Sequence, residues 1–287
     1  MSGKHIDEIS GVETTGHEWD GIRELNNPLP RWWVWTFYLT IIWAIGYAIA
    51  YPSIPLLSGN TKGLLNQTNR SDLAAELAAA KGAQAKYLDA IAAKDVTAIA
   101  ADADLRQFAI AGGSAAFKVN CVQCHGSGAA GSPGYPNLND DDWLWGGDLN
   151  AVYTTLTHGV RYAADAETRV SEMPAFADIL KPEEIDLVAN YASSLSGGAA
   201  DAAKAASGKQ LFTDNCASCH GEDGKGGRDF GAPNLTDALW LYGSDTAQIA
   251  AQISHPKHGV MPAWSARLGD VTVKQLAVYV HSLGGGE

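Results

Sequence analysis

Basic residues and cysteines are both scarce in this sequence. Its 20 lysines and arginines are outnumbered by 32 aspartates and glutamates, which gives a formal net charge of −12. Such a charge argues against binding a nucleic acid through its phosphates and fits a basic protein partner. Cysteine occurs four times and methionine three times, one of the methionines being the initiator. We expect residues this rare, if they recur in a pattern, to carry the chemistry.

Long uncharged stretches are also few, and the longest extends from Trp32 to Thr61. Its core, WWVWTFYLTIIWAIGYAIAY at 32–51, has about the length that a helix needs to cross a bilayer. Tryptophans at one end and tyrosines at the other resemble interfacial aromatic belts. Pro52 and Pro55 would end the helix. We therefore predict a membrane anchor over 32–57, preceded by an N-terminal segment over 1–31.

Two other interpretations of this apolar stretch are open. A buried helix of a soluble protein would show one polar face, and this stretch shows none. A cleavable signal peptide is suggested by Ala-Ile-Ala at 48–50, which resembles a cleavage site. The apolar run is longer than the roughly 7–15 residues of such a signal, and an acidic segment precedes it. Lysines and arginines flank the stretch almost equally, so they do not set its orientation.

Alanine dominates the next segment, as in SDLAAELAAAKGAQAKYLDAIAAKD. Alanine is the best helix former, but the apolar face of this segment is weak. We predict a helical spacer over 58–107 that carries little chemistry.

From about residue 108 the chain repeats itself. Five blocks recur in the same order: AFKVNCVQCHG and LFTDNCASCHG, YPNLNDDDWLWGG and APNLTDALWLYGS, THGV and KHGV, EMPAF and VMPAW, LVANYASSLSGG and LAVYVHSLGGG. The repeat predicts two small α-helical domains, 108–198 and 199–287, each with a loop rich in glycine and proline and neither with a strand pattern. Units with so few apolar side chains cannot build a good core alone, so we expect a bound group to complete each one.

Each repeat contains one Cys-x-x-Cys-His motif, which is the attachment arrangement for c-type haem. The motifs consist of Cys121, Cys124 and His125, and of Cys216, Cys219 and His220. Two thiols bind the haem covalently, and the following histidine ligates its iron. A thioredoxin-like pair needs a βαβ context, a zinc site needs both pairs to converge, and disulfides would not explain the histidines. We predict two covalently bound haem c groups.

Methionine supplies the predicted sixth iron ligand. The two methionines after the initiator occupy matching MPA blocks, as Met173 and Met261. We assign each to its own repeat, with His125 and Met173 on the first iron and His220 and Met261 on the second. Spacing also allows the two methionines to be exchanged, and the matched His158 and His258, with His255, are the alternative ligands. Histidine–methionine ligation leaves no open position, which suits electron transfer.

Further residues are candidates for the surroundings of the haems. Trp143, Trp145, Trp240 and Tyr242 recur between the repeats and fit either a haem pocket or ordinary core packing. Arg161 could pair with a haem propionate, although the second repeat has no counterpart. The segment 161–172 is almost unmatched, because HGV runs directly into MPA in the second repeat. We predict a surface loop there that distinguishes the partners of the two haems.

The whole chain resembles one family, the dihaem subunit III (FixP/CcoP type) of cbb3-type cytochrome c oxidases. NNPLPRWWVWTFYLTIIWAIGYAIAYPSIPL at 26–56 is the most family-specific segment, and NCVQCHG and NCASCHG are the most secure chemically. The resemblance implies a mainly α fold, with one N-terminal transmembrane helix followed by two tandem class I cytochrome c domains.

The resemblance also implies a non-catalytic electron-transfer subunit of a proton-pumping oxidase. Electrons would come from a soluble or membrane-bound donor cytochrome c. They would leave to a monohaem c subunit and a haem–copper catalytic subunit. Haem c is attached outside the cytoplasm, so we expect 1–31 in the cytoplasm and 58–287 in the periplasm of a bacterial inner membrane. The alternatives are a cytochrome subunit of a periplasmic dehydrogenase and a ligand-binding haem sensor.

Overall fold

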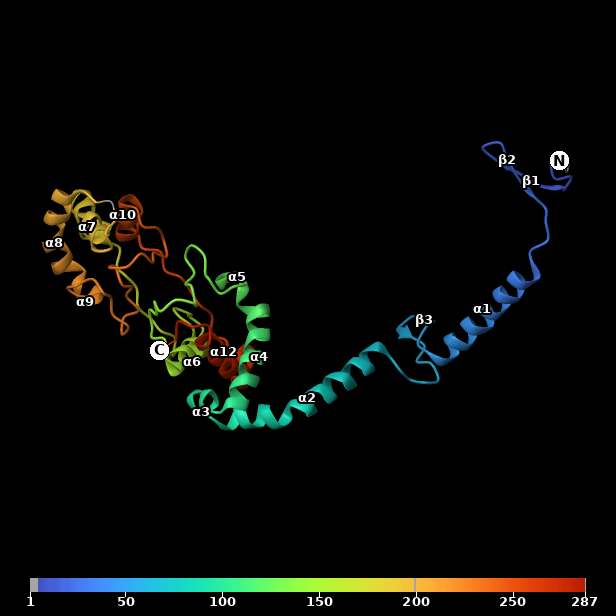
Figure 1. Cartoon of the computed structure of the whole chain (residues 1–287), viewed down its shortest axis with the longest axis horizontal. Coiled ribbons are helices and arrows are strands. Elements are labelled where there is room, and N and C mark those ends of the chain that lie inside the picture. Colours follow the sequence, from blue (N-terminus) through green and yellow to red (C-terminus); the bar gives the residue numbers. More distant parts are fainter. Residues whose placement is uncertain (1–4, 199, 287) are drawn as a thin grey trace. The chain divides into compact units, whose positions relative to one another are not determined.

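The computed structural model describes residues 5–198 and 200–286, and it divides into two compact units, Met1–Ala83 and Gln84–Glu287 (Figure 1). The first unit begins with an antiparallel hairpin of β1 (Thr14–Trp19) and β2 (Ile22–Leu25), which the sequence analysis did not predict. Asp20 and Gly21 turn the chain with φ angles of 50° and 81°. These are the left-handed angles that an Asp-Gly hairpin turn requires.

Helix α1 (Arg31–Ala50) is the predicted apolar helix. Arg31 is its single charged residue, none of its residues is buried, and it is long and apolar enough to cross a membrane. The helix ends before Pro52, as predicted, so residues 51–57 of the predicted anchor lie outside it. Residues Pro55–Leu56 (β3) pair instead with Gly59–Asn60 (β4).

Helices and the long loops between them form the described part of the second unit. After α2 (Asn69–Ala93), aspartate side chains at the N-caps start α3 (Val96–Ala101), α4 (Ala103–Asn120), α6 (Leu149–His158), α8 (Ala202–Asn215) and α10 (Thr246–Ser254). Pro182 occupies the first turn of α7 (Pro182–Leu195), where proline is favoured. The remaining elements are α5 (Val122–His125), a 3₁₀ turn η1 (Phe176–Asp178), α9 (Ala217–His220), α11 (Ser265–Leu268) and α12 (Asp270–His281).

Helix packing does not follow the boundaries of the two repeats. Helix α4 of the first repeat packs against α12 at the end of the second, whereas α7 of the first repeat packs against α8 of the second. Figure 1 shows α7, α8, α9 and α10 grouped together, with α4, α6 and α12 in a second group. We call residues 173–254 the inserted lobe and residues 96–160 with 261–283 the split lobe. In this structure the helices of the two predicted domains, 108–198 and 199–287, therefore pack across the repeats.

Two equivalent glycines allow these helix pairs to approach closely. Gly113 of α4 lies against the main chain of Gln275 in α12, and Gly208 of α8 lies against the main chain of Leu187 in α7. A Cβ atom at either glycine would collide with the carbonyl oxygen opposite it. Each glycine is eight residues before the first cysteine of its motif, so the two helix pairs are built in the same way.

Substitution of Gly113 by alanine is expected to destabilise the split lobe by about 1–3 kcal/mol, because α4 and α12 must move apart. Urea unfolding followed by circular dichroism measures this change. Gly82→Ala in α2 is the control, since a Cβ atom there meets no other atom and alanine favours the helix. Equal stability of the two variants would show that the close crossing is not needed.

The end of the predicted spacer is part of the fold. Ile91 of α2 and Ile99 of α3 are fully buried and form a core cluster with Leu105, Ala109 and Val278. The Lys274 ammonium of α12 donates to the Ile91 and Ala92 carbonyl oxygens near the end of α2, at 3.5 and 3.2 Å. The end of the predicted spacer 58–107, from about residue 87 onward, therefore packs in the cluster that includes Val278 of α12.

Candidate haem sites

Each Cys-x-x-Cys-His motif lies at the junction of two helices. Cys121 ends α4 and begins α5, and Cys216 ends α8 and begins α9. These two cysteines are buried, at 8% and 7% exposure, whereas Cys124 and Cys219 are exposed. One thiol of each pair therefore lies inside a lobe and the other at its surface.

Burial, with a smaller effect of the neighbouring thiol, raises the pKa of both Cys121 and Cys216 to about 11. A redox-active Cys-x-x-Cys pair needs the opposite, a lowered thiol pKa. None of the four cysteines is paired in a disulfide, and Cys121 and Cys216 belong to different core clusters. The structure thus disfavours the thioredoxin-like, disulfide and shared-zinc interpretations.

Each motif histidine is oriented by a main-chain carbonyl. His125 Nδ1 lies 3.1 Å from Pro136 O, and His220 Nδ1 lies 3.2 Å from Pro233 O. Because a carbonyl oxygen can only accept, we assign the proton to Nδ1, which leaves the Nε2 lone pair for a metal. Burial lowers the pKa of both imidazoles and so favours the neutral form that ligation requires.

The loops after the two motifs have the same hydrogen bonds. The carbonyl oxygen of His125 accepts from Gly131 N, and that of His220 accepts from Gly226 N. Leu138 N donates to Ala129 O in one loop, and Leu235 N donates to Gly224 O in the other. The repeated PNL blocks therefore carry the carbonyls that orient the histidines, a role that the sequence analysis missed although it noted the blocks.

The methionines pack opposite to the predicted assignment. Met261 contacts the buried cluster of the split lobe, which contains Phe117, Cys121, Val152 and Leu156. Met173 contacts the cluster of the inserted lobe, which contains Phe212, Cys216, Ile249 and Ile253. Each methionine therefore packs on the cluster that contains the first motif cysteine of the other repeat, whereas the predicted pairing was His125 with Met173 and His220 with Met261. The exchange that spacing allowed is the arrangement in this structure.

Hydrogen bonds hold the Met261 segment against α6 of the other repeat. Val160 and Met261 exchange two main-chain hydrogen bonds of 2.9 and 3.0 Å. Trp264 N donates to Leu156 O, and the Ser265 hydroxyl donates to Thr157 O at 3.0 Å. Gly159, with φ of 72°, is the residue that this contact requires, because a Cβ atom would collide with Met261 O.

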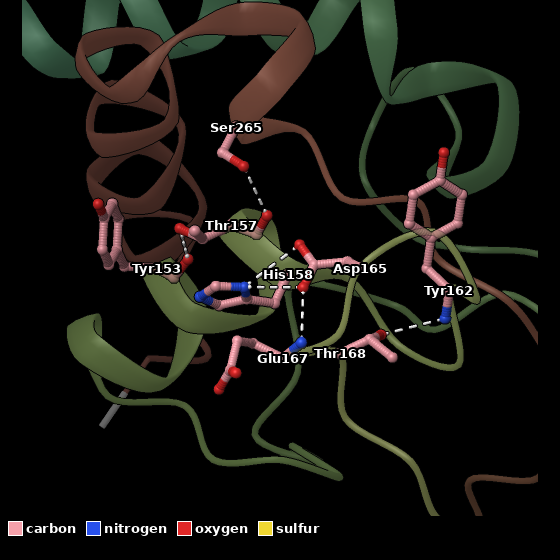
Figure 2. A network of polar contacts seen from close by, with 8 residues as sticks. All are labelled: Tyr153, Thr157, His158, Tyr162, Asp165, Glu167, Thr168 and Ser265. Atoms are coloured by element: carbon pink, nitrogen blue, oxygen red, sulfur yellow. Dashed lines mark hydrogen bonds and ion pairs between the residues drawn. The ribbon is translucent and has the colours of Figure 1, made fainter.

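The alternative histidine ligands make other contacts. His158 Nδ1 lies 3.2 and 3.3 Å from the two carboxylate oxygens of Asp165, which also accepts from Glu167 N (Figure 2). This network ties the 161–172 loop to the end of α6. His255 follows α10 and is exposed, and His258 is half-buried.

The repeated aromatic residues divide into two kinds. Trp143 packs against the core cluster of the split lobe and Trp240 against that of the inserted lobe. Trp145 instead lies against Gly231, and Tyr242 lies against Gly134, the equivalent glycine of the other repeat. Gly134 N also donates to Leu241 O at 2.7 Å. Trp145 and Tyr242 therefore each contact a residue of the other lobe.

These residues fit two haem c groups. Each lobe provides a buried and an exposed thiol in one helical turn, and an imidazole held with Nε2 available. Each also provides a half-buried thioether packed on the same apolar cluster. This donor set is that of a covalently attached haem with histidine and methionine ligands.

Three family models match the chain. The N-terminal domain of cytochrome oxidase-cbb3, FixP, matches residues 11–58, cytochrome c matches 110–196, and cytochrome c oxidase, cbb3-type, subunit III matches 203–280. The chain is similar to FixP subunits of cbb3-type cytochrome c oxidases from Rhizobium meliloti and Rhizobium etli. Identity is 63% over 99% of this chain and 98% of the relative for the first, and 60% over the full length of both chains for the second. It is 55% identical to the CcoP subunit from Cereibacter sphaeroides, over 96% of this chain and 95% of the relative.

Proposed function

The chain belongs to the FixP/CcoP family of cbb3-type cytochrome c oxidase subunits, and we propose that its two haems are ligated crosswise between the repeats. His125 and Met261 would ligate the haem on Cys121 and Cys124. His220 and Met173 would ligate the haem on Cys216 and Cys219. The proposal is supported by the packing of each methionine on the core cluster of the opposite repeat.

The chain is a cytochrome c electron-transfer subunit with two covalently bound haem c groups. Each haem, when bound, supplies a one-electron iron couple. The carbonyls of Pro136 and Pro233 hold the imidazole tautomers, so the histidines need no proton shift when the iron charge changes. The two thioethers would occupy the sixth iron positions, which would favour electron transfer over ligand binding.

Membrane attachment follows from α1 and from the family. We place residues 1–31 in the cytoplasm and the haem lobes in the periplasm of a bacterial inner membrane, because haem c is attached outside the cytoplasm. A donor cytochrome c would reduce the haems, and a monohaem c subunit and the haem–copper subunit would receive the electrons. The net charge of −12 favours a basic donor, with an association rate that falls as salt rises.

Purification of the tagged full-length chain from gently solubilised membranes tests this function. The expected result is haem b and copper together with haem c, with oxygen uptake when reduced cytochrome c is added. A matched preparation carrying Cys121→Ala, Cys124→Ala, Cys216→Ala and Cys219→Ala should lack the haem c of this chain. Haem c without haem b and copper, or with a dehydrogenase cofactor, would contradict the oxidase assignment.

A further inference from the structure

Arg161 lies where the methionine-bearing segments of both sites meet. Its Nε donates to Gly259 O at 2.7 Å, and its Nη1 donates to Ser171 O at 2.9 Å. Gly259 is two residues before Met261, and Ser171 is two residues before Met173. One half-buried guanidinium therefore bonds to equivalent positions ahead of both methionines.

The Met173 segment has little other main-chain support. Within residues 5–198 and 200–286, residues 170–174 form no hydrogen bond between main-chain atoms. The Met261 segment is paired with Val160, the residue that precedes Arg161. Arg161 therefore connects the Met173 segment, through hydrogen bonds of its side chain, to the Met261 segment, whose main chain is already paired.

The backbone of Arg161 is itself fixed in an unfavourable conformation. Its φ angle is 52°, in the left-handed region that few residues other than glycine adopt. Arg161 N donates to Arg169 O at 2.8 Å, and Val160 on its other side is bonded to Met261. These bonds hold the strained residue so that its side chain spans the gap between Gly259 and Ser171.

We propose that Arg161 is a positioning residue that fixes the sixth-ligand methionine of both haems at once. This inference rests on the proposed crosswise ligation and adds to it a link between the two sites. The link also gives the unmatched 161–172 segment a role, because only the first repeat contains the residue that joins the two methionine segments.

The experiment compares Arg161→Gln with the wild-type full-length, haem-loaded protein. The measured quantities are the near-infrared methionine–iron band of the oxidised protein and the affinity of each ferric haem for added imidazole, which competes with methionine. Loss of a charge-assisted hydrogen bond on each segment is expected to tighten imidazole binding about tenfold at both haems. Covalent haem content should stay at two per chain. A change in imidazole affinity at one haem alone, or at neither haem, would overturn the proposal.

Two control variants separate positioning from charge and from general loop stability. Arg161→Lys keeps the charge, but one ammonium cannot reproduce the two diverging bonds, so at least one haem should still bind imidazole more tightly. Wild-type behaviour of this variant at both haems would overturn the proposal in favour of charge alone. Arg161→Lys also tests the proposal if Arg161→Gln does not fold.

Arg169→Gln removes a comparable half-buried guanidinium from the same loop. Its Nη atoms donate to Trp145 O and Ala151 O, neither of which is on a methionine segment. We expect the imidazole affinity of this variant to match that of the wild type. If Arg169→Gln tightened imidazole binding at both haems as much as Arg161→Gln does, the proposal would be overturned. Absence of the methionine–iron band in the wild type would instead refute the ligation itself.

Discussion

Replacement of Cys121 and Cys124 by alanine is expected to leave one covalent haem per chain instead of two. Cys121 is part of the buried cluster with Phe117, Val152 and Leu156, so loss of the haem removes the group that completes this core. A pyridine haemochrome assay on the purified chain, divided by protein concentration, measures the loss. Two haems per chain in the variant would refute attachment at this motif.

The same variant should loosen helices from both repeats. Because α12 packs against α4 and α6, amide hydrogen exchange is expected to rise in residues 270–281 as well as 103–120. Residues 182–195 of α7 should keep their protection, because they pack in the inserted lobe. The matched variant, Cys216→Ala with Cys219→Ala, should give the reverse pattern. Loosening confined to residues 108–198 would mean that each repeat folds as its own unit.

The local features of the chain could be predicted from its sequence. The apolar run and Pro52 placed α1 almost correctly, and the Cys-x-x-Cys-His spacing gave the residues that we propose for haem attachment. These features depend on residues close together in the chain. The hairpin of β1 and β2 was missed, although an Asp-Gly pair such as Asp20-Gly21 is a recognised hairpin-turn signal.

The apolar patterns could not predict that α4 packs against α12 and α7 against α8. Helices α7 and α12 carry similar stripes, since they close equivalent repeats, so either could pack on α4 or on α8. The connection between α7 and α8 was the available signal. Only residues 196–201 separate Leu195 from Ala202, and helices joined by so short a connection are usually antiparallel neighbours. Pairing of α4 with α12 then follows from exclusion of the other partner.

Crosswise ligation makes a second strong prediction, which needs a protein with one haem. In the Cys216→Ala, Cys219→Ala background, the remaining haem is attached at Cys121 and Cys124. Addition of Met261→Ala should abolish the methionine–iron band, because Met261 is the thioether packed on that cluster. Addition of Met173→Ala should leave the band unchanged, because Met173 packs in the other lobe. The near-infrared spectrum of the oxidised protein distinguishes the two methionine variants.

The mirror background, Cys121→Ala with Cys124→Ala, should reverse these results. There Met173→Ala should remove the band and Met261→Ala should not. Loss of the band through Met173→Ala in the first background would restore ligation within each repeat and contradict the packing. Persistence of the band in both would place the sulfur ligand elsewhere. Only crosswise ligation predicts that Met261→Ala removes the ligand of the haem attached in the first repeat and that Met173→Ala removes the ligand of the haem attached in the second. In each case the haem attached in the same repeat as the substituted methionine keeps its ligand.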